Sequence, residues 1–315
     1  MATLSTATSN FSSTVTALVS RRLEEALRSK YVHTTPGNFI PAQRMGNGTN
    51  SLTYVGYADL AASTTALSEG SAPTDNALTI AVDQATATQV GATVAISDLA
   101  ELESPHALFS VAADVIADNA AKTIDVLVRE ILAAGASVQY VTNTSRATVA
   151  TSNVITGAQV KKMQALLARS NVTKFGGGTY RCIIHPDSVY DLQTDTANGG
   201  WMDIWKYTSG TPLLTEEIGQ FAGVRFQVSS NAKVFATAGA GSANVYSAFF
   251  FGPDSYVLGD LQSVRTYFVA PGGDHSDPLA QKAIVGWKAA LGCMLLDANG
   301  TKYVRLEHGT TLNLG

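Results

Sequence analysis

The hydrophobic pattern of the chain centres on one long amphipathic segment, residues 104–135. Its apolar residues are Leu108, Val111, Ala112, Val115, Ile116, Ile124, Leu127, Val128, Ile131 and Leu132. A spacing of three and four residues places them on one face of a helix. Ser104 followed by Pro105 predicts an N-cap with proline at the first helical position, and Gly135 predicts the end. The segment therefore predicts a rod of roughly 45 Å.

The N-terminal part contains a shorter amphipathic pattern. Residues 1–13 are mostly Ser, Thr and Asn with little to bury, which is typical of a mobile or partner-dependent tail. Residues 14–30 predict a helix whose apolar stripe consists of Val15, Leu18, Val19, Leu23, Ala26 and Leu27. This helix either packs on the core of its own chain or forms an arm that docks on a neighbouring molecule.

Residues 52–66 and 78–97 alternate between apolar and polar side chains, as β-strands do. The stretch between them, residues 68–76, is dense in turn-forming residues. The simplest structure is a long two-stranded hairpin. Because an isolated hairpin is marginal in water, it must lie on another surface.

Residues 136–270 predict a mixed region of helices and strands. Residues 157–170 are amphipathic at helical spacing, and 180–184, 219–229 and 245–258 are strand candidates. The last of these is almost continuously apolar, as in the middle of a sheet.

The C-terminal part contains two apolar runs, residues 283–296 and 301–307. The turn between them includes Asn299-Gly300, a strong hairpin signal. We expect the two runs to pair as a hairpin that packs against the helix of residues 104–135, in an α+β fold.

Composition adds that this chain is poor in charge. Of its 315 residues, 15% are charged and 45% are hydrophobic, and the net charge is -4. Charged residues make up about 25% of typical proteins, so we expect partners to cover much of the surface. A net negative charge argues against a protein that grips nucleic acid. Cys182 and Cys293 suggest buried thiols rather than a disulfide or a zinc site, and no apolar run is long enough to span a membrane.

Catalytic motifs are largely missing from the sequence. The triple glycine at 176–178 lacks the residues of a phosphate-binding loop, so a turn is favoured. His185 with Asp187 and Asp191 could form an acid–base or metal cluster, but a cap and turn at the start of a helix is the favoured interpretation. Trp201 and Trp205 favour a core or interface anchor over a stacking platform. We expect no enzyme, no cofactor and no metal.

Five short strings in order carry a resemblance to a known family. They are Ala66-Leu67-Ser68-Glu69-Gly70, Val94-Ala95-Ile96-Ser97-Asp98, Ile184-His185-Pro186-Asp187 with Tyr190-Asp191-Leu192, Glu217-Ile218-Gly219 with Gly223-Val224-Arg225-Phe226, and Asp277-Pro278-Leu279-Ala280-Gln281 with Val285-Gly286-Trp287-Lys288. Together they span roughly residues 50–308. The chain resembles the major capsid proteins of tailed bacteriophages, in the N-four-like family, whose fold is the Hong Kong 97-type capsid fold.

The resemblance implies a division of the chain into four parts. These are an N-terminal arm at 1–48, an extended hairpin called the E-loop at 49–90, a peripheral domain at 91–135 and 271–311, and an axial domain at 136–270. The peripheral domain would contain the spine helix 104–135 and the C-terminal hairpin. The candidate inter-subunit contacts are Arg21, Arg22, Arg44, Glu69, Trp201 and Trp205.

The resemblance also implies partners and a location. Many copies would form pentamers and hexamers of an icosahedral head that encloses double-stranded DNA, assembled in the host bacterial cytoplasm with scaffolding, portal and cement proteins and no membrane. The founding member of the fold cross-links through an E-loop lysine, but residues 49–90 contain no lysine, so we expect a non-covalent shell. An encapsulin-like compartment shell and, more remotely, a hydrolase using His185 and Asp187 remain the alternatives.

Overall fold

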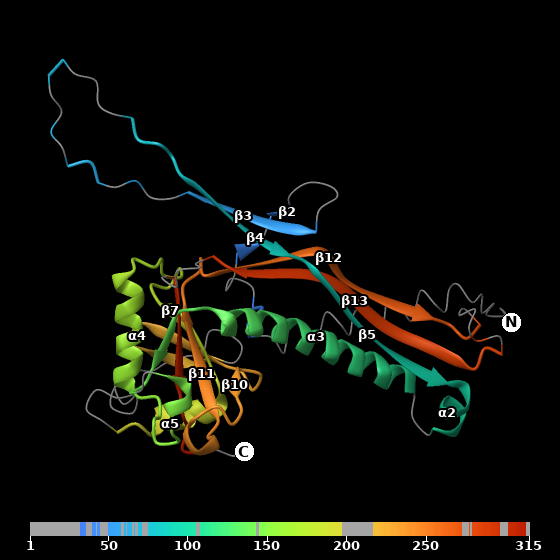
Figure 1. Cartoon of the computed structure of the whole chain (residues 1–315). Coiled ribbons are helices and arrows are strands. Elements are labelled where there is room, and N and C mark those ends of the chain that lie inside the picture. The colour runs from blue at the N-terminus through green and yellow to red at the C-terminus, as the bar shows by residue number, and fades with distance from the viewer. Residues whose placement is uncertain are drawn as a thin grey trace.

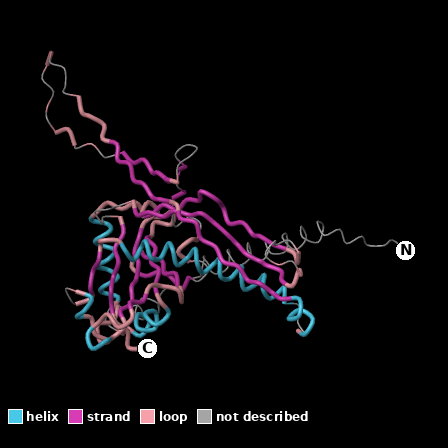
Figure 2. The backbone as a smooth tube through the Cα atoms, turned by 45° about the vertical axis from the view of Figure 1, so that its right-hand side comes forward, coloured by secondary structure: helices cyan, strands magenta, loops and turns pink. Residues whose placement is uncertain are grey.

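The structure is elongated, with a hairpin arm projecting from two lobes (Figure 1). It is a computed structural model that describes residues 32–35, 40–41, 43–44, 50–57, 60, 62–64, 66, 69–70, 75–104, 108–142, 145–196, 217–272, 277, 279–296 and 302–312. One lobe is a long helix under a sheet of long strands. The other is a more compact α/β lobe at the C-terminal end of that helix, as the tube in Figure 2 also shows.

Helix α3, Leu108–Ala134, is the predicted long helix, and its end agrees with the sequence. Residues 98–103 form a separate helix, α2 (Asp98–Glu103), capped by the Ser97 side chain, which accepts a hydrogen bond from the Ala100 N–H (3.2 Å). Ser104 is the C-cap of α2, in an extended conformation. Residues 105–107 lie outside the described residues, so the predicted start of the long helix at Ser104 and Pro105 stays a prediction.

A four-stranded sheet lies along the first two-thirds of α3. Its order is β1 (Ile40–Pro41), β12 (Tyr256–Val269), β13 (Lys282–Leu295) and β5 (Thr88–Ser97), antiparallel except for β1, which runs parallel to β12. The buried face of α3 is rich in alanine here, so the helix lies close to the sheet. Ala117 and Ala120 pack with Ile116 against Trp287 and Ala289 of β13. The predicted helix-on-sheet layer is confirmed.

The predicted C-terminal hairpin is wrong. Strand β13 pairs with β12 and β5, whereas β14 (Tyr303–His308) pairs with β11 (Val245–Phe251) and β6 (Val138–Tyr140) in the other lobe. Strand β12, which has 14 residues, pairs with β13 along its length. Strand β14 is fully buried and lies between β6 and β11. The turn signal at 299–300 lies outside the described residues, and the strands on its two sides belong to different sheets.

The strand predicted at 245–258 is likewise two strands. Strand β11 ends at Phe251, and after a turn β12 begins at Tyr256 in the other sheet. The Ser255 hydroxyl closes the turn, accepting from the Gly252 N–H (3.1 Å) and donating to the Gly252 carbonyl (2.8 Å). A Cβ at Gly252 would meet the Thr173 carbonyl oxygen at 2.6 Å, so only glycine fits this approach.

A seven-stranded sheet forms the core of the compact lobe. Strand β11 is buried along its whole length, as its sequence predicts. On one face, Phe250 packs with Met163 of α4; on the other, Phe249 packs with Leu132 of α3. Helix α3 therefore contacts both sheets and joins the lobes. The elements of the compact lobe are β6, η1 (Arg146–Thr148), α4 (Gly157–Arg169), β7 (Tyr180–Ile184), α5 (Pro186–Thr194), β8 (Glu217–Phe221), β9 (Val224–Val228), β10 (Val234–Phe235), η2 (Ala240–Ser242), β11 and β14.

The projecting arm contains the predicted N-terminal hairpin, but the predicted extent is wrong, because residues 88–97 form β5 and pair with β13 in the four-stranded sheet. Strands β3 (Ser51–Tyr57) and β4 (Ile80–Thr86) pair antiparallel, and β2 (Gln43–Arg44) adds a short third strand at the base. Only Ala87 separates β4 from β5, so the arm is continuous with the four-stranded sheet. The loop beyond β3 and β4 extends far from both lobes (Figure 1).

Candidate inter-subunit surfaces

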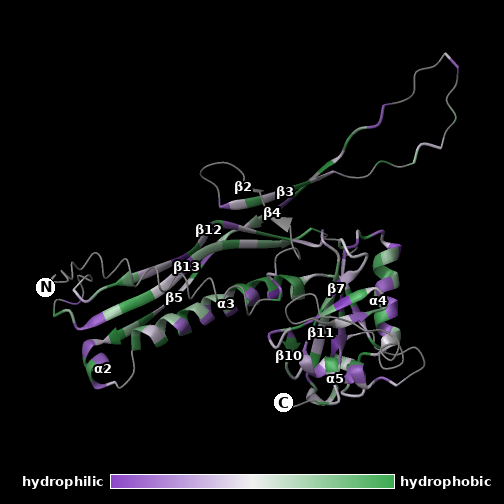
Figure 3. Cartoon of the chain, turned by 180° about the vertical axis from the view of Figure 1, so that it is seen from behind, coloured by the Kyte–Doolittle hydropathy of each residue, from purple (hydrophilic) through white to green (hydrophobic). Residues whose placement is uncertain are grey.

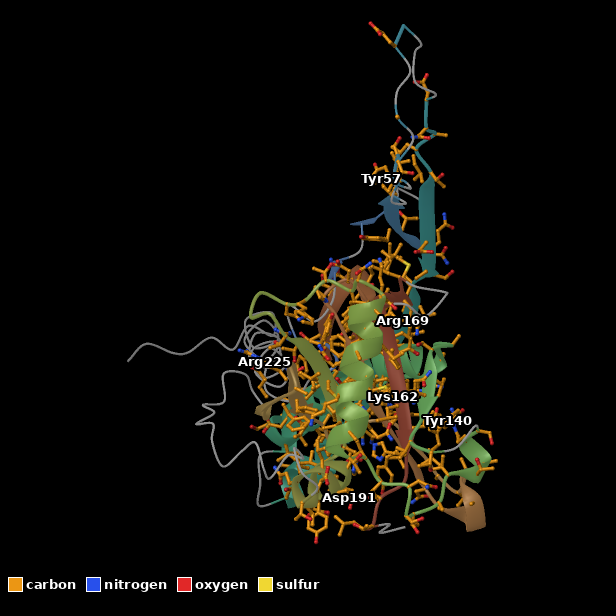
Figure 4. All side chains as sticks on the ribbon, turned by 90° about the vertical axis from the view of Figure 1, so that its left-hand side faces the viewer. Tyr57, Tyr140, Lys162, Arg169, Asp191 and Arg225 are labelled. Carbon is orange, nitrogen blue, oxygen red and sulfur yellow. The ribbon has the colours of Figure 1, made fainter. Side chains whose placement is uncertain are left out.

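One face of the projecting hairpin is apolar and exposed. Val55 lies opposite Val82, and Tyr57 lies opposite Ile80, so these four side chains share one face. Their exposed fractions are 43%, 49%, 66% and 55%, respectively. Figure 3 shows the hydrophobic colouring on this arm, and Figure 4 places Tyr57 far from the lobes.

Two further large apolar side chains are exposed beyond the paired strands. Leu60 and Leu78, beyond the last strand pair, are 58% and 61% exposed. A two-stranded hairpin with six exposed large apolar side chains has no core of its own to bury them. Apolar patches of this kind mark interaction sites on soluble proteins.

A groove of about 450 Å³ lies over strands β5, β12 and β13. Trp287 points toward α3, where its Nε1–H donates to Asn119 Oδ1 (3.0 Å). Because side chains alternate along a strand, the neighbouring Gly286 and Lys288 face away from the helix. Gly286 and Gly91 leave bare backbone in the groove, with Tyr267 of β12 also lining it. The sheet therefore offers a hollow on the face opposite α3.

Charged residues hold the C-terminal end of α3 to the compact lobe. The Arg305 guanidinium donates to the carbonyls of Ala133 and Gly135, which are among the unpaired acceptors at the helix end. Beside it, the fully buried Glu307 accepts two hydrogen bonds from Arg146, at 2.7 and 2.8 Å, and lies 2.9 Å from Arg305 Nε. The hydrogen bond to Glu307 raises the pKa of Arg146. This cluster fixes the angle between the long helix and β14.

A second buried polar cluster fastens residues 32–35 to α3. Asp125 accepts from the His33 N–H (3.0 Å) and from Asn231 Nδ2 (2.6 Å), and it lies 2.9 Å from His33 Nδ1. The Tyr256 hydroxyl donates to the His33 carbonyl (2.6 Å). Burial by itself would raise the pKa of Asp125, but the hydrogen bonds and charge of His33 and the amide of Asn231 outweigh it and lower that pKa. Residues 32–35 are thus held to α3 by buried hydrogen bonds.

His185 caps helix α5, as the favoured interpretation of the sequence proposed. Its Nδ1 accepts from the Asp187 N–H (3.2 Å), and the Tyr246 hydroxyl donates to Asp187 Oδ2 (2.9 Å). Burial lowers the pKa of His185, and burial with the Asp187 bond raises the pKa of Tyr246 to about 12. Asp191 accepts from the N–H (3.1 Å) and hydroxyl of Thr311. These groups join α5 to β11 and to the residues after β14.

Within the described ranges, no three His, Cys, Asp or Glu side chains are grouped to hold a metal ion. Cys182 is buried, and burial raises the pKa of both Cys182 and Cys293. No helix in the described part of the chain is both long and apolar enough to cross a membrane.

The described residues include only two of the six predicted contact residues, Arg44 and Glu69. Arg21, Arg22, Trp201 and Trp205 lie outside the described residues. Arg44 is paired with Leu52 through the backbone of β2, and Glu69 is exposed in a turn of the loop with Gly70 (φ +75°). The roles of these six residues stay predictions.

The comparisons with known proteins settle the family. A family model described as phage capsid protein matches residues 84–265, more than half of the chain. The chain belongs to the phage capsid protein family. The match begins within β4 and ends within β12, so it includes α3 and most of the compact lobe. No curated protein matches the chain significantly.

Solved structures confirm the capsid fold of this phage capsid protein. The capsid of Ralstonia phage GP4 has a TM-score of 0.66 at 15% identity, covering 90% of this chain and 87% of that chain. The cyanophage Pam1 capsid has a TM-score of 0.65 at 16% identity, covering 90% of both chains. A virus-like particle from Pyrococcus furiosus has a TM-score of 0.52 at 10% identity, covering 92% of this chain and 98% of that chain. The expected Hong Kong 97-type capsid fold is therefore confirmed.

The sequence analysis did not predict two features of this phage capsid protein: the exposure of the apolar hairpin face and the buried pair of His33 and Asp125. The hairpin pairs, such as Tyr57 with Ile80, were readable as alternation, but nothing local indicated that the apolar face is exposed. The His33 and Asp125 pair left one signal: an aspartate inside the apolar stripe of a helix, beside Ile124 and Val128. A charge at such a position indicates a buried partner.

Proposed function

We propose that this phage capsid protein is the major capsid protein, many copies of which form pentamers and hexamers of an icosahedral head around double-stranded DNA. The observation that carries the proposal is the apolar face on a hairpin that projects away from its own subunit. This face has four large exposed side chains, two more are exposed in the adjoining loop, and among the described residues the arm extends away from both lobes.

A second copy supplies the matching surface in this proposal. The hairpin of one subunit lies across the four-stranded sheet of the next, where the groove over Gly91 and Gly286 receives side chains such as Tyr57. The donor and acceptor surfaces are different, so the contact is heterologous and closes into rings when the rotation allows it. Rings of five and six are the units of an icosahedral shell.

Burial gives the scale of the contact. Fully burying a large apolar side chain stabilises by about 1.5–3 kcal/mol, and the six side chains are roughly half exposed. Together they would contribute roughly 5–8 kcal/mol per contact before the ordering cost of the arm is subtracted. Such an individually modest contact suits a shell in which each subunit makes several.

The division of the chain into domains is also part of the proposal. Strands β12, β13 and β14 are assigned to domains by the sheets in which they pair. Residues 1–48 form the N-terminal arm and 49–90 the E-loop. The peripheral domain comprises 91–135 with β12 and β13, and the axial domain comprises the rest of 136–270 with β14.

The charge pattern is consistent with enclosing DNA rather than binding it tightly. From 31 to 121 the chain has no lysine, one arginine and nine acidic residues, and the net charge is -4. A wall that held DNA through many cations would oppose its packing and release. We further propose assembly in the host bacterial cytoplasm, with scaffolding, portal and cement proteins as partners, and no catalytic role.

The test is assembly of the full chain with and without the apolar face. Sedimentation and electron microscopy of wild-type protein should show rings or shells. The double variant Tyr57→Ser and Ile80→Ser should remain folded by circular dichroism and sediment as single subunits. Tyr190→Ser, which removes an exposed tyrosine from α5, is the matched control and should assemble normally.

Two outcomes would contradict the proposal. A wild-type chain that stays monomeric at high concentration would oppose a shell role. Particles from infected cells that contain a cargo enzyme and no nucleic acid would favour the encapsulin-like alternative.

A further inference from the structure

We propose that strand β5 pairs antiparallel with β5 of a second copy, so that two four-stranded sheets join across a two-fold axis. Three observations carry the proposal: an open strand edge that lacks protection against pairing, apolar side chains that are only half buried at that edge, and a sequence that complements itself. The pairing stands on these observations alone, whereas its place in a shell rests on the proposed function.

Strand β5 forms one edge of the four-stranded sheet. Its ten residues all pair with β13 without a register shift, and no strand in the described part of the chain pairs with its other side. Beyond the strand, the Asp98 N–H donates to the Gln281 carbonyl (2.9 Å), which continues the same ladder. Because hydrogen bonding alternates along an antiparallel strand, the N–H and C=O groups of residues 89, 91, 93, 95 and 97 point to the open side.

This edge lacks the features that natural proteins use to prevent strands from pairing. Charged side chains, prolines, bulges and short length are the usual means. No charged residue and no proline occurs between Asp83 and Asp98. The other edge strands of the described sheets are all protected: β1, β6 and β10 have two or three residues, β2 and β4 contain a charged residue, and β8 has a bulge. Strand β5 is therefore the edge that is open to a partner strand.

The side chains on the α3 side of β5 are incompletely covered. Val90, Ala92 and Val94 pack against the cluster of Ile116 and Trp287, but all three are only half buried. The β13 residues that pair with them are at most 2% exposed. A further strand beside β5 would complete the burial of these side chains, as β5 does for β13.

The sequence of β5 complements itself. With Thr93 on the two-fold axis, side chains of similar character meet on both faces. On the α3 side, Val90 lies opposite Ile96 of the second copy, and on the other side Gln89 lies opposite Ser97. In this register the residues whose N–H and C=O groups point outward also meet one another, as an antiparallel ladder requires. The contact is isologous, so it joins two copies and no more.

The size of the contact suits a link between rings. It is one strand wide, smaller than the interfaces of about 1,200–2,000 Å² that hold stable complexes together. Free subunits should therefore pair only transiently. In the proposed shell, the hairpin contacts form the rings, and each ring presents several β5 edges at once, which raises their effective concentration. The two-fold contact then links one ring to the next.

Disulfide trapping at the two-fold axis tests the pairing. The experiment uses the full chain with Tyr57→Ser and Ile80→Ser, which should not assemble through its hairpin. Adding Thr93→Cys places two cysteines opposite each other, at a Cα separation of about 5.5 Å that suits a disulfide, so oxidation should give a covalent dimer. Ser170→Cys, at the exposed end of α4, is the control and should cross-link roughly tenfold more slowly. Both native cysteines are unreactive, because burial raises the pKa of their thiols.

Charge at the edge tests the register. The exposed Ala95 would lie opposite Gly91 of the second copy, and Gly91 pairs with Lys288 in its own sheet. In the Thr93→Cys background, Ala95→Lys therefore brings like charges together and should slow cross-linking roughly fivefold. Ala95→Glu, the matched control at the same position with the opposite charge, should cross-link at least as fast as the parent.

Two results would overturn the proposal. The first is a Thr93→Cys chain that forms no covalent dimer, or forms it no faster than Ser170→Cys. The second is equal cross-linking rates for Ala95→Lys and Ala95→Glu. A wild-type chain that forms no rings, together with fast cross-linking of Thr93→Cys, would contradict the proposed function and support the strand pairing.

Discussion

Replacing Asp125 by alanine should detach residues 32–35 from α3 and strongly destabilise the subunit. Asp125 is 1% exposed and accepts hydrogen bonds from His33 N–H and Asn231 Nδ2, with His33 Nδ1 at 2.9 Å. The alanine variant would leave these three groups without that acceptor. The His33 ring packs edge-on against the ring of Phe249, which offers no acceptor to replace the carboxylate.

The magnitude follows from the number of groups left unpaired. Each buried unsatisfied polar group costs about 1–3 kcal/mol, and members of one network add less than fully. We expect about 3–5 kcal/mol for Asp125→Ala. For Asp125→Asn, which keeps one carbonyl acceptor and the side-chain volume, we expect about 2–3 kcal/mol. For a chain of this size, the free energy of unfolding should fall with urea at a rate near the upper end of about 1–3 kcal/mol/M. The urea midpoint of Asp125→Ala should therefore lie roughly 1 M or more below that of the wild type.

The measurement is urea unfolding of the unassembled chain, followed by tryptophan fluorescence and circular dichroism. Glu103→Gln, a neutralised carboxylate on the exposed side of α2, is the matched control and should shift stability by less than about 0.5 kcal/mol. If Asp125→Ala unfolds at the same urea concentration as Glu103→Gln, the buried cluster does not stabilise the fold and the reasoning is wrong.

The pH dependence has a defined sign. Because the folded state lowers the pKa of Asp125, its contribution is complete above the unfolded pKa of about 3.9 and is lost as pH falls through the lower native pKa. The stability difference between wild type and Asp125→Asn should therefore be constant from pH 7 to about 5 and shrink below about pH 4. A difference that grows with acid would contradict the direction of the pKa shift.

Three further predictions concern other sites. Arg146→Ala leaves buried Glu307 with Arg305 alone and should cost about 2–4 kcal/mol in urea unfolding, whereas Arg169→Ala, at the exposed end of α4, should cost less than about 0.5 kcal/mol. Gly135→Ala would press a methyl group against the Tyr303 hydroxyl and should lower stability by about 1–3 kcal/mol in thermal melts; Gly176→Ala, with open space around it, should not. Mature particles should run as single chains in denaturing electrophoresis, because residues 49–90 contain no lysine; a ladder of covalent multimers would refute this.

Periodicity sufficed for the elements that bury one regular face. The repeat through Ile116, Ile124 and Leu132 identified α3 because a helix on a sheet needs an apolar stripe. The unbroken apolar run of 245–251 identified β11 because both of its faces are covered.

Strand pairing was less accessible, because it depends on distant parts of the chain. Strand β14 contains Arg305, Glu307 and His308, which suggest a half-exposed strand, yet all six residues are buried. Arg146 binds Glu307, and the end of α3 binds Arg305, but neither partner is nearby in sequence. The pairing that tertiary contacts impose therefore overrides the local turn signal at Asn299-Gly300.

The candidate inter-subunit surfaces were likewise only partly predictable from local sequence patterns. The alternation that includes Val55 and Tyr57 predicted the hairpin, whereas its exposure follows from the arm leaving the fold, which no local pattern encodes. The contact residues drawn from the resemblance fall mostly in segments outside the described ranges. The partners of Asp125 could not be predicted, because His33 and Asn231 are distant from it in sequence.

The position of β14 has a consequence for synthesis of the subunit. This strand lies between β6 and β11, so the sheet of the compact lobe stays divided until residues 303–308 have left the ribosome. Until then β6 and β11 both have unpaired edges, and α3 lacks the Arg305 contacts at its end. The compact lobe can therefore complete its sheet only after residue 308 has been translated. Chains interrupted before that residue cannot adopt the shape that assembly requires.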